Sequence, residues 1–109
     1  MQAAIESRVS IRPLGSADLD AVVAIDPSIE GRSRRPYFER RLNAALREPA
    51  LHAQFAAVGE QGVAGYILAR VLEGEFGRNE SELRFEAVGV RGDSQGKGIG
   101  KQLFGALED

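Results

Sequence analysis

A glycine-rich loop near the end of the chain carries the clearest chemical signal. Residues 95–100 read QGKGIG, and they lie between an apolar run ending at Val90 and the amphipathic segment KQLFGALED. Glycine lets the backbone approach a ligand closely and adopt positive φ, so that successive N–H groups can converge on anionic oxygens. The start of a helix adds the positive end of its dipole. The pattern therefore predicts a loop that binds pyrophosphate.

Three other interpretations of this loop are less favoured. A Rossmann loop would follow the first strand of a parallel βαβ unit, with an acidic residue about 20 residues later. Only nine residues follow Gly100 here. A Walker A loop would continue from Lys into Ser or Thr, but Lys101 is followed by Gln102. A plain glycine turn would need neither the preceding apolar strand nor the following helix.

The first half of the chain, which must support this loop, is predicted to hold a strand and two helices. The strand covers residues 8–13. Ser16 is a suitable N-cap for a first helix, which ends before Pro27. The second helix covers residues 36–48 and has an apolar face. Residues 29–35 between the helices are expected to be an exposed connection.

The second half of the chain is predicted to form an antiparallel meander. Two apolar runs, 51–58 and 63–72, are joined by the tight turn GEQG, which favours a hairpin. After a polar loop at 74–80, a third run at 83–90 joins the same sheet and leads into the glycine loop. The fold class is therefore α+β, with a mostly antiparallel sheet in the order β-α-α-β-β-β-α. The final helix is expected to bury Leu103, Phe104 and Leu107.

Composition excludes several functional classes. The length of 109 residues suits one domain. The absence of cysteine excludes a disulfide framework, a thiolate zinc site and a cysteine nucleophile, and nothing near the single histidine, His52, resembles the nucleophile turn of a Ser-His-Asp site. A net charge of -2 argues against a nucleic-acid partner, so the cluster Arg34, Arg35, Arg40 and Arg41 is interpreted as a solvated helix face. Without a signal peptide or an apolar run of about 20 residues, we expect a cytoplasmic protein without a membrane partner.

The segment VRGDSQGKGIGKQLFGAL resembles the signature of the GNAT superfamily of N-acyltransferases. In that signature a strand is followed by Gln or Arg, two residues, Gly, one residue, and then Gly or Ala. Gln95, Gly98 and Gly100 occupy those positions. The predicted order of elements is similar to that of the family as well. The resemblance implies one α/β/α-like GNAT domain over residues 1–109, with acetyl-CoA as cofactor and no metal.

The resemblance also implies a place for each part of the cofactor. Main-chain groups at the end of the strand would pair with the pantetheine arm, and a backbone N–H near Val88 would stabilise negative charge on the thioester oxygen. The glycine loop would hold the pyrophosphate. The implied cofactor-binding residues are Val88, Gly89, Val90, Gln95, Gly96, Lys97, Gly98, Ile99, Gly100 and Lys101.

The family also uses a carboxylate on this strand to accept the proton of the attacking amine. Glu86 is the first candidate for this catalytic role and Glu82 the second, and each can also be interpreted as a solvent-facing strand residue. Tyr66 is interpreted as a packing residue rather than an acid. Candidates for the acceptor pocket, with surface positions as the favoured alternative, are Arg32, Arg34 and Tyr37.

The function implied by the resemblance is direct transfer of an acetyl group from acetyl-CoA to a primary amine of a small molecule or peptide. A complete GNAT domain continues beyond the third helix with a strand, a helix and two closing strands, whereas this chain ends at Asp109. We therefore expect an open edge on strand 83–90, covered in a homodimer or by a partner chain, or else a fragment of a longer product. The alternative function is a non-catalytic CoA-binding or interaction module.

Overall fold

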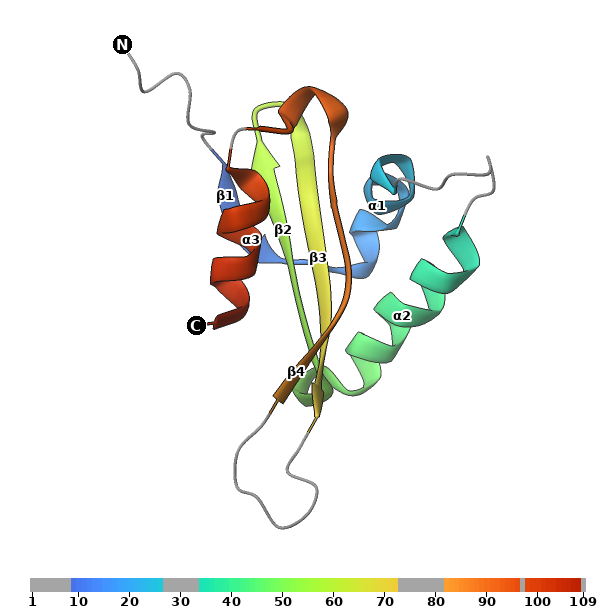
Figure 1. Cartoon of the computed structure of the whole chain (residues 1–109). Helices are drawn as coiled ribbons and strands as arrows, with labels where there is room; N and C mark the ends of the chain where they lie inside the picture. Colours follow the sequence, from blue (N-terminus) through green and yellow to red (C-terminus); the bar gives the residue numbers. More distant parts are fainter. Residues whose placement is uncertain (1–8, 27–33, 73–81, 97, 109) are drawn as a thin grey trace.

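The computed structural model describes residues 9–26, 34–72, 82–96 and 98–108. Short 3-10 turns precede α1, follow α2 and follow β4. The predicted α+β order is confirmed. The predicted loop at 74–80, Arg8 and most of the predicted connection at 29–35 lie outside the described residues. The elements are β1 (Ser10–Pro13), α1 (Leu19–Ile25), α2 (Arg35–Arg47), β2 (His52–Gly59), β3 (Gly62–Leu72), β4 (Glu82–Val90) and α3 (Ile99–Glu108) (Figure 1).

The strands form one antiparallel sheet in the order β1-β2-β3-β4. The predicted hairpin is present, because Gly59 pairs with Gly62 across a two-residue turn. Gly62 has a φ of 99°, a conformation that residues with a Cβ rarely adopt. β4 follows β3 in the sheet and forms one of its edges, as expected for strand 83–90.

β4 contains a bulge at Glu86. Leu68 of β3 pairs with Ala87, whereas the next residue, Ala69, pairs with Phe85. Glu86 therefore has no partner across the ladder, and two residues of β4 lie opposite one of β3. As a result Glu86 and Ala87 both lie on the side of the sheet that α1 and α2 cover, where Glu86 contacts α2 and Ala87 joins the core.

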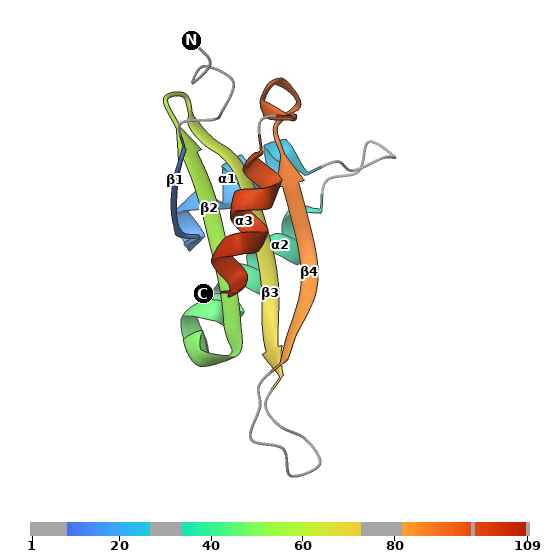
Figure 2. The ribbon, with the colours of Figure 1, turned by 60° about the vertical axis from the view of Figure 1, so that its left-hand side comes forward.

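Helices cover both faces of the sheet. α1 and α2 lie on one face, and α3 lies on the other, over β2 and β3 (Figure 2). None of the helices in the described ranges has the length and apolar character needed to span a membrane. The core on the α1 and α2 side is built around Leu14, Val22, Phe38, Leu42, Ala56, Tyr66, Leu68 and Ala87. The core on the α3 side is built around Ala57, Ala64, Ile67, Ile99 and Leu103.

Two predictions about local packing were wrong. Ser16 is not the N-cap: it lies in a 3-10 turn that starts after Gly15, and the Asp18 carboxylate accepts the Gly15 N–H (2.9 Å). Phe104 is not buried but 44% exposed, and its ring lies 5.4 Å from that of Phe85. Because α3 lies over β2 and β3, the side of the helix that carries Phe104 extends toward the β4 edge, where the described residues leave it partly open.

Candidate functional site

The glycine loop between β4 and α3 has the backbone conformation that its sequence predicts. Gly96 and Gly98 both have a φ of 81°, in the left-handed region that favours glycine. An ideal Cβ at either position would meet nothing within 4 Å, so the need for glycine there is conformational rather than steric. Lys97, the residue between them, lies outside the described residues.

The amides at the start of α3 precede the described hydrogen bonds of the helix. The first backbone bond of the helix runs from the N–H of Gln102 to the C=O of Gly98 (3.1 Å). The N–H groups of Ile99, Gly100 and Lys101 precede that bond, and within the described part of the chain they have no backbone acceptor. The Gln95 N–H differs from the prediction, because it points into the preceding turn, toward the C=O of Gly92 (3.4 Å). The amides without a described backbone acceptor therefore lie at the helix start rather than across the whole loop.

The open edge of β4 presents backbone groups from two of the predicted residues. The N–H of Arg91 donates to the C=O of Ala64 on β3 (2.8 Å). Because hydrogen bonding alternates along an antiparallel strand, the N–H and C=O groups of Val88 and Val90 then face away from β3. The side chain of Gln95 agrees with this direction, since its Nε2 donates to the outward C=O of Val90 (3.1 Å). Gln95 thus supports the loop through its side chain.

A pocket joins the strand edge to the helix start. Its volume is about 420 Å³. Ile25 at the end of α1 forms one wall and Phe104 of α3 another, and sequence reasoning had assigned neither to the site. No local pattern identifies Ile25, because its place in the pocket depends on how α1 packs. The predicted cofactor-binding residues that line the pocket are Val88, Gly89, Val90, Gln95 and Gly100.

The two candidate catalytic residues lie at different places along β4. Glu86 lies close to Val88 on β4, and its Oε1 accepts a bond from Nε of Arg41 (2.6 Å). Glu82 is the first residue of β4, about 20 Å from Val88 at about 3.3 Å per residue. Tyr37 of α2 lies near Glu86: burial raises the pKa of its hydroxyl, and the Glu86 charge raises it further. The structure thus brings Glu86 and Tyr37 together, whereas Glu82 lies at the opposite end of β4 from Val88.

Tyr66 packs beneath β4, against Gly89. Its side chain is fully buried, and its ring meets that of Phe38 edge-on at 5.8 Å. An ideal Cβ on Gly89, its partner across the ladder, would lie 2.6 Å from the Tyr66 ring. The hydroxyl is buried and has no hydrogen-bond partner within the described ranges. Burial, and secondly the charge of Asp26, raises the pKa of Tyr66 to about 12.

An ion pair lies beside this tyrosine, at the start of α2. Arg34 donates through Nε and Nη2 to both carboxylate oxygens of Asp26 (2.9 and 2.5 Å). The Asp26 side chain is only 2% exposed, and the guanidinium also covers the rings of Tyr37 and Phe38, at 5.6 and 5.1 Å. Arg34 thus lies near Tyr37 and Tyr66, and Tyr37 in turn lies near Glu86. Arg32 lies outside the described residues.

The arginine cluster is largely engaged in ion pairs. Arg34 pairs with Asp26, and Arg35 donates to Asp20 (2.7 Å). Arg41 is 6% exposed and bonds Glu86, so its prediction as part of a solvated face was wrong. The helical spacing held a signal that was missed, because residue 41 follows Phe38 by three positions and therefore shares its buried face. A charged side chain on such a face requires a partner.

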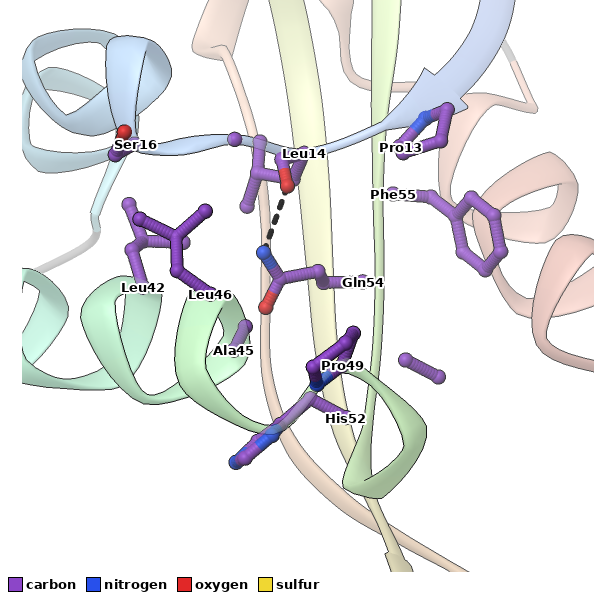
Figure 3. Close-up of a pocket in the computed structure, with 12 residues that line it drawn as sticks. Pro13, Leu14, Ser16, Leu42, Ala45, Leu46, Pro49, His52, Gln54 and Phe55 are labelled. Atoms are coloured by element: carbon purple, nitrogen blue, oxygen red, sulfur yellow. Dashed lines mark hydrogen bonds between the residues drawn. The ribbon is translucent and has the colours of Figure 1, made fainter.

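A second pocket lies between the C-terminal half of α2 and the β1 and β2 side of the sheet (Figure 3). Its volume is about 380 Å³, and Leu42, Leu46 and Pro49 contribute to a mainly apolar lining. Gln54 crosses it and donates through Nε2 to the C=O of Leu14 (2.7 Å), as Figure 3 shows. No predicted cofactor-binding or catalytic residue lines this pocket.

Comparison with known proteins places the chain in a family. Residues 19–109 match the model of the acetyltransferase (GNAT) family, whereas a comparison with curated proteins finds no match. Glucosamine-6-phosphate N-acetyltransferase from Arabidopsis thaliana has a similar structure, with a TM-score of 0.75 at 18% identity, covering 94% of this chain and 74% of that one. A possible acetyltransferase from Clostridium difficile 630 gives 0.74 at 20% identity, covering 92% and 68%.

A third similar structure is the ribosomal-protein-alanine N-acetyltransferase from Brucella melitensis biovar Abortus 2308. Its TM-score is 0.70 at 20% identity, and the match covers 93% of this chain and 70% of that one. At these identities the likeness concerns the fold, whereas the family model matches most of the sequence. The chain therefore belongs to the GNAT family of acetyltransferases.

Proposed function

We propose that this chain transfers an acetyl group from acetyl-CoA to a primary amine. The observation that carries the proposal is the set of amides at Ile99, Gly100 and Lys101, which start α3 beside a pocket lined by the open edge of β4. Converging N–H groups at a helix start suit a diphosphate. The outward N–H and C=O groups of Val88 and the outward N–H of Val90 suit the amide-containing pantetheine arm, which can pair with an edge strand.

The residues present fit this ligand sterically. The space beside Gly96, Gly98 and Gly100 is open, since an ideal Cβ at each position meets nothing within 4 Å. Acetyl-CoA, when bound, supplies the activated acetyl group as a thioester. The amide of Ile99 and its two successors would hold the diphosphate, and the N–H of Val88 would stabilise negative charge on the thioester oxygen.

Proton transfer is proposed for Glu86. The amine nitrogen forms a bond to the acetyl carbon, the bond from that carbon to sulfur breaks, and the amine loses a proton that Glu86 accepts directly or through water. The departing thiolate takes up a proton to give CoA. Glu86 suits this role better than Glu82 because it lies near Val88, although its Oε1 is already bonded to Arg41.

The acceptor class rests on the nature of the similar proteins. Two of them are named as N-acetyltransferases, one for glucosamine-6-phosphate and one for the alanine of a ribosomal protein. An amine acceptor, small or peptidic, is therefore proposed here as well. Tyr37 and the Asp26–Arg34 pair, which surround the Glu86 side of β4, would contribute to its recognition.

Two measurements test the proposal. Calorimetry with acetyl-CoA and with CoA measures binding, and a thiol-release assay over a panel of sugar, polyamine and peptide amines measures turnover. We expect micromolar binding and thiol release that depends on an amine. Binding without release on any amine would support a non-catalytic CoA-binding module instead. Absence of binding would contradict both functions.

A second copy of this chain is proposed to cover the Phe85 end of the β4 edge, outside the stretch 88–90 that is proposed for the cofactor. Phe85 and Phe104, whose rings lie 5.4 Å apart at that end, are 49% and 44% exposed. Edge strands and exposed apolar pairs favour association. Sedimentation of the 109-residue chain should give a dimer, and Phe85→Glu should give a monomer. A wild-type monomer at high concentration would contradict this proposal.

A further inference from the structure

A buried arginine on α2 holds the bulge of β4 in place. Arg41 donates through Nε to Oε1 of Glu86 (2.6 Å) and through Nη2 to the C=O of Ala69 on β3 (2.8 Å). Glu86 is the residue without a partner across the ladder, and Ala69 is the β3 residue at which the register shifts. One guanidinium therefore ties the two strands together where their ladder is interrupted.

The bulge determines which side each later residue of β4 faces. Side chains alternate along a strand, so a slip by one residue would move all of them to the other face. With the bulge, Val88 and Val90 pack on the α3 side, and Gly89 lies beneath Tyr66. Without it, a valine would come under the Tyr66 ring, where even a Cβ would be 2.6 Å from the ring. The same slip would exchange the backbone groups that face the open edge.

Gln54 fixes the orientation of the guanidinium from the other side. Its Oε1 accepts a bond from Nη1 of Arg41 (2.6 Å), and its Nε2 donates to the C=O of Leu14 (2.7 Å; Figure 3). Arg41 thus donates to three acceptors on β2, β3 and β4. The planar guanidinium of arginine has several N–H donors in fixed directions and suits this arrangement, whereas the single ammonium of lysine does not.

We propose that Arg41 is a positioning residue of the acetyl-CoA site. Through Glu86 and Ala69 it sets the register of residues 87–90, and so directs the backbone groups of Val88 and Val90 toward the cofactor. The proposal rests on the proposed function for its effect on binding. It also gives the Glu86 side chain a role that is separate from proton transfer.

The test compares variants of Arg41 with a matched control. Arg40→Met removes an exposed arginine from the same helix, whereas Arg41→Lys and Arg41→Met remove the three-way contact. Hydrogen exchange within residues 87–90 is measured in the free protein at the two amides that face β3, those of Ala87 and Gly89, and acetyl-CoA affinity is measured by calorimetry. We expect both Arg41 variants to exchange at least about tenfold faster at 87–90 and to bind acetyl-CoA at least about tenfold more weakly. Arg40→Met should change neither.

Glu86→Gln separates the two roles of Glu86. The amide oxygen of glutamine can still accept the bond from Arg41 Nε, so exchange at 87–90 and acetyl-CoA affinity should stay within about twofold of wild type. Thiol release should fall if the carboxylate accepts the proton. If Glu86→Gln binds acetyl-CoA more weakly while exchange at 87–90 stays like wild type, the two roles of Glu86 are not separate in the way proposed.

Several outcomes would overturn the positioning role. One is that the Arg41 variants exchange at 87–90 like wild type. Another is that exchange becomes faster to the same extent in β2 and β4, which indicates a merely structural role. If Arg41→Met does not fold, Arg41→Lys decides, because it keeps the charge. If the wild type does not bind acetyl-CoA, the proposed function fails, while the exchange comparison still decides whether Arg41 sets the register.

Discussion

Replacement of Gly100 by leucine should abolish cofactor binding and leave the fold intact. Gly100 is the second residue of α3, lines the pocket of about 420 Å³, and would have nothing within 4 Å of an added Cβ. Its backbone is helical, so a side chain introduces no strain there. Leucine has a better helix propensity than glycine by roughly 0.5–1 kcal/mol, and the free energy of unfolding should therefore stay the same or rise slightly.

The expected loss of affinity follows from the amides that the new side chain would cover. Leucine at position 100 would stand in front of the N–H groups of Ile99, Gly100 and Lys101. A hydrogen bond to a charged group contributes about 1.5–3 kcal/mol. Losing two of them would weaken acetyl-CoA binding by about 3 kcal/mol or more, which is roughly a hundredfold or greater change in Kd.

The assay is calorimetry with acetyl-CoA alongside urea unfolding of the same preparations. Gly105→Leu is the matched control, because Gly105 lies in the same helix, also has open space around a Cβ, and does not line the pocket. It should bind acetyl-CoA like wild type. Unchanged affinity in a stable Gly100→Leu variant would refute the placement of the diphosphate at the start of α3.

Three further predictions concern buried groups. Burial raises the pKa of Tyr66 from 10.0 to about 12, so the hydroxyl resists ionisation in the folded state and stability is lost as pH rises from 10 toward 12. Between these pH values the Tyr66→Phe variant should lose less unfolding free energy than the wild type, by up to about 3 kcal/mol, as measured by urea unfolding. Equal losses in the two proteins would contradict this. The Arg12 guanidinium, together with the Gly15 N–H, holds the pKa of Asp18 below its usual 3.8, so its contribution is present above that pH and is lost as pH falls through the lowered pKa. Asp18→Asn should therefore unfold more easily at pH 7, by about 1–2 kcal/mol, and the difference should vanish in strong acid. Gly89→Ala should destabilise by about 1–3 kcal/mol through contact with the Tyr66 ring; pairing it with Tyr66→Leu should recover most of the loss, and additive effects in the unfolding midpoints would argue against that contact.

The order of elements could be predicted because its signals are local. Apolar runs of strand length separated by a short glycine-bounded turn indicate a hairpin wherever they occur, as Gly59 and Gly62 confirm. The N-cap failed because a competing local group was overlooked. Asp18, held by Arg12 (2.9 Å), reaches back to the Gly15 N–H and starts a 3-10 turn before Ser16 can act as the cap.

The site could be predicted only in the part that its own segment encodes. Glycine at positions 96 and 98 of the loop sequence indicates the positive φ that the structure has there. The bulge at Glu86 instead lies against Arg41, which lies 45 residues earlier in the chain. The wall formed by Ile25 depends on how α1 docks against the end of β4. Contacts between distant segments follow from packing, which no spacing of residues reveals.

The β4 edge differs in charge along its length, and this bears on aggregation. Arg84 pairs across the ladder with Arg70, and both are exposed, so like charges lie side by side at one end of the β3–β4 pair. Charged side chains on an edge strand discourage unwanted strand addition. The other end, residues 87–90, reads AVGV and has no such protection. A ligand bound there would also shield the protein from misassembly, and heating should give less turbidity when CoA is present.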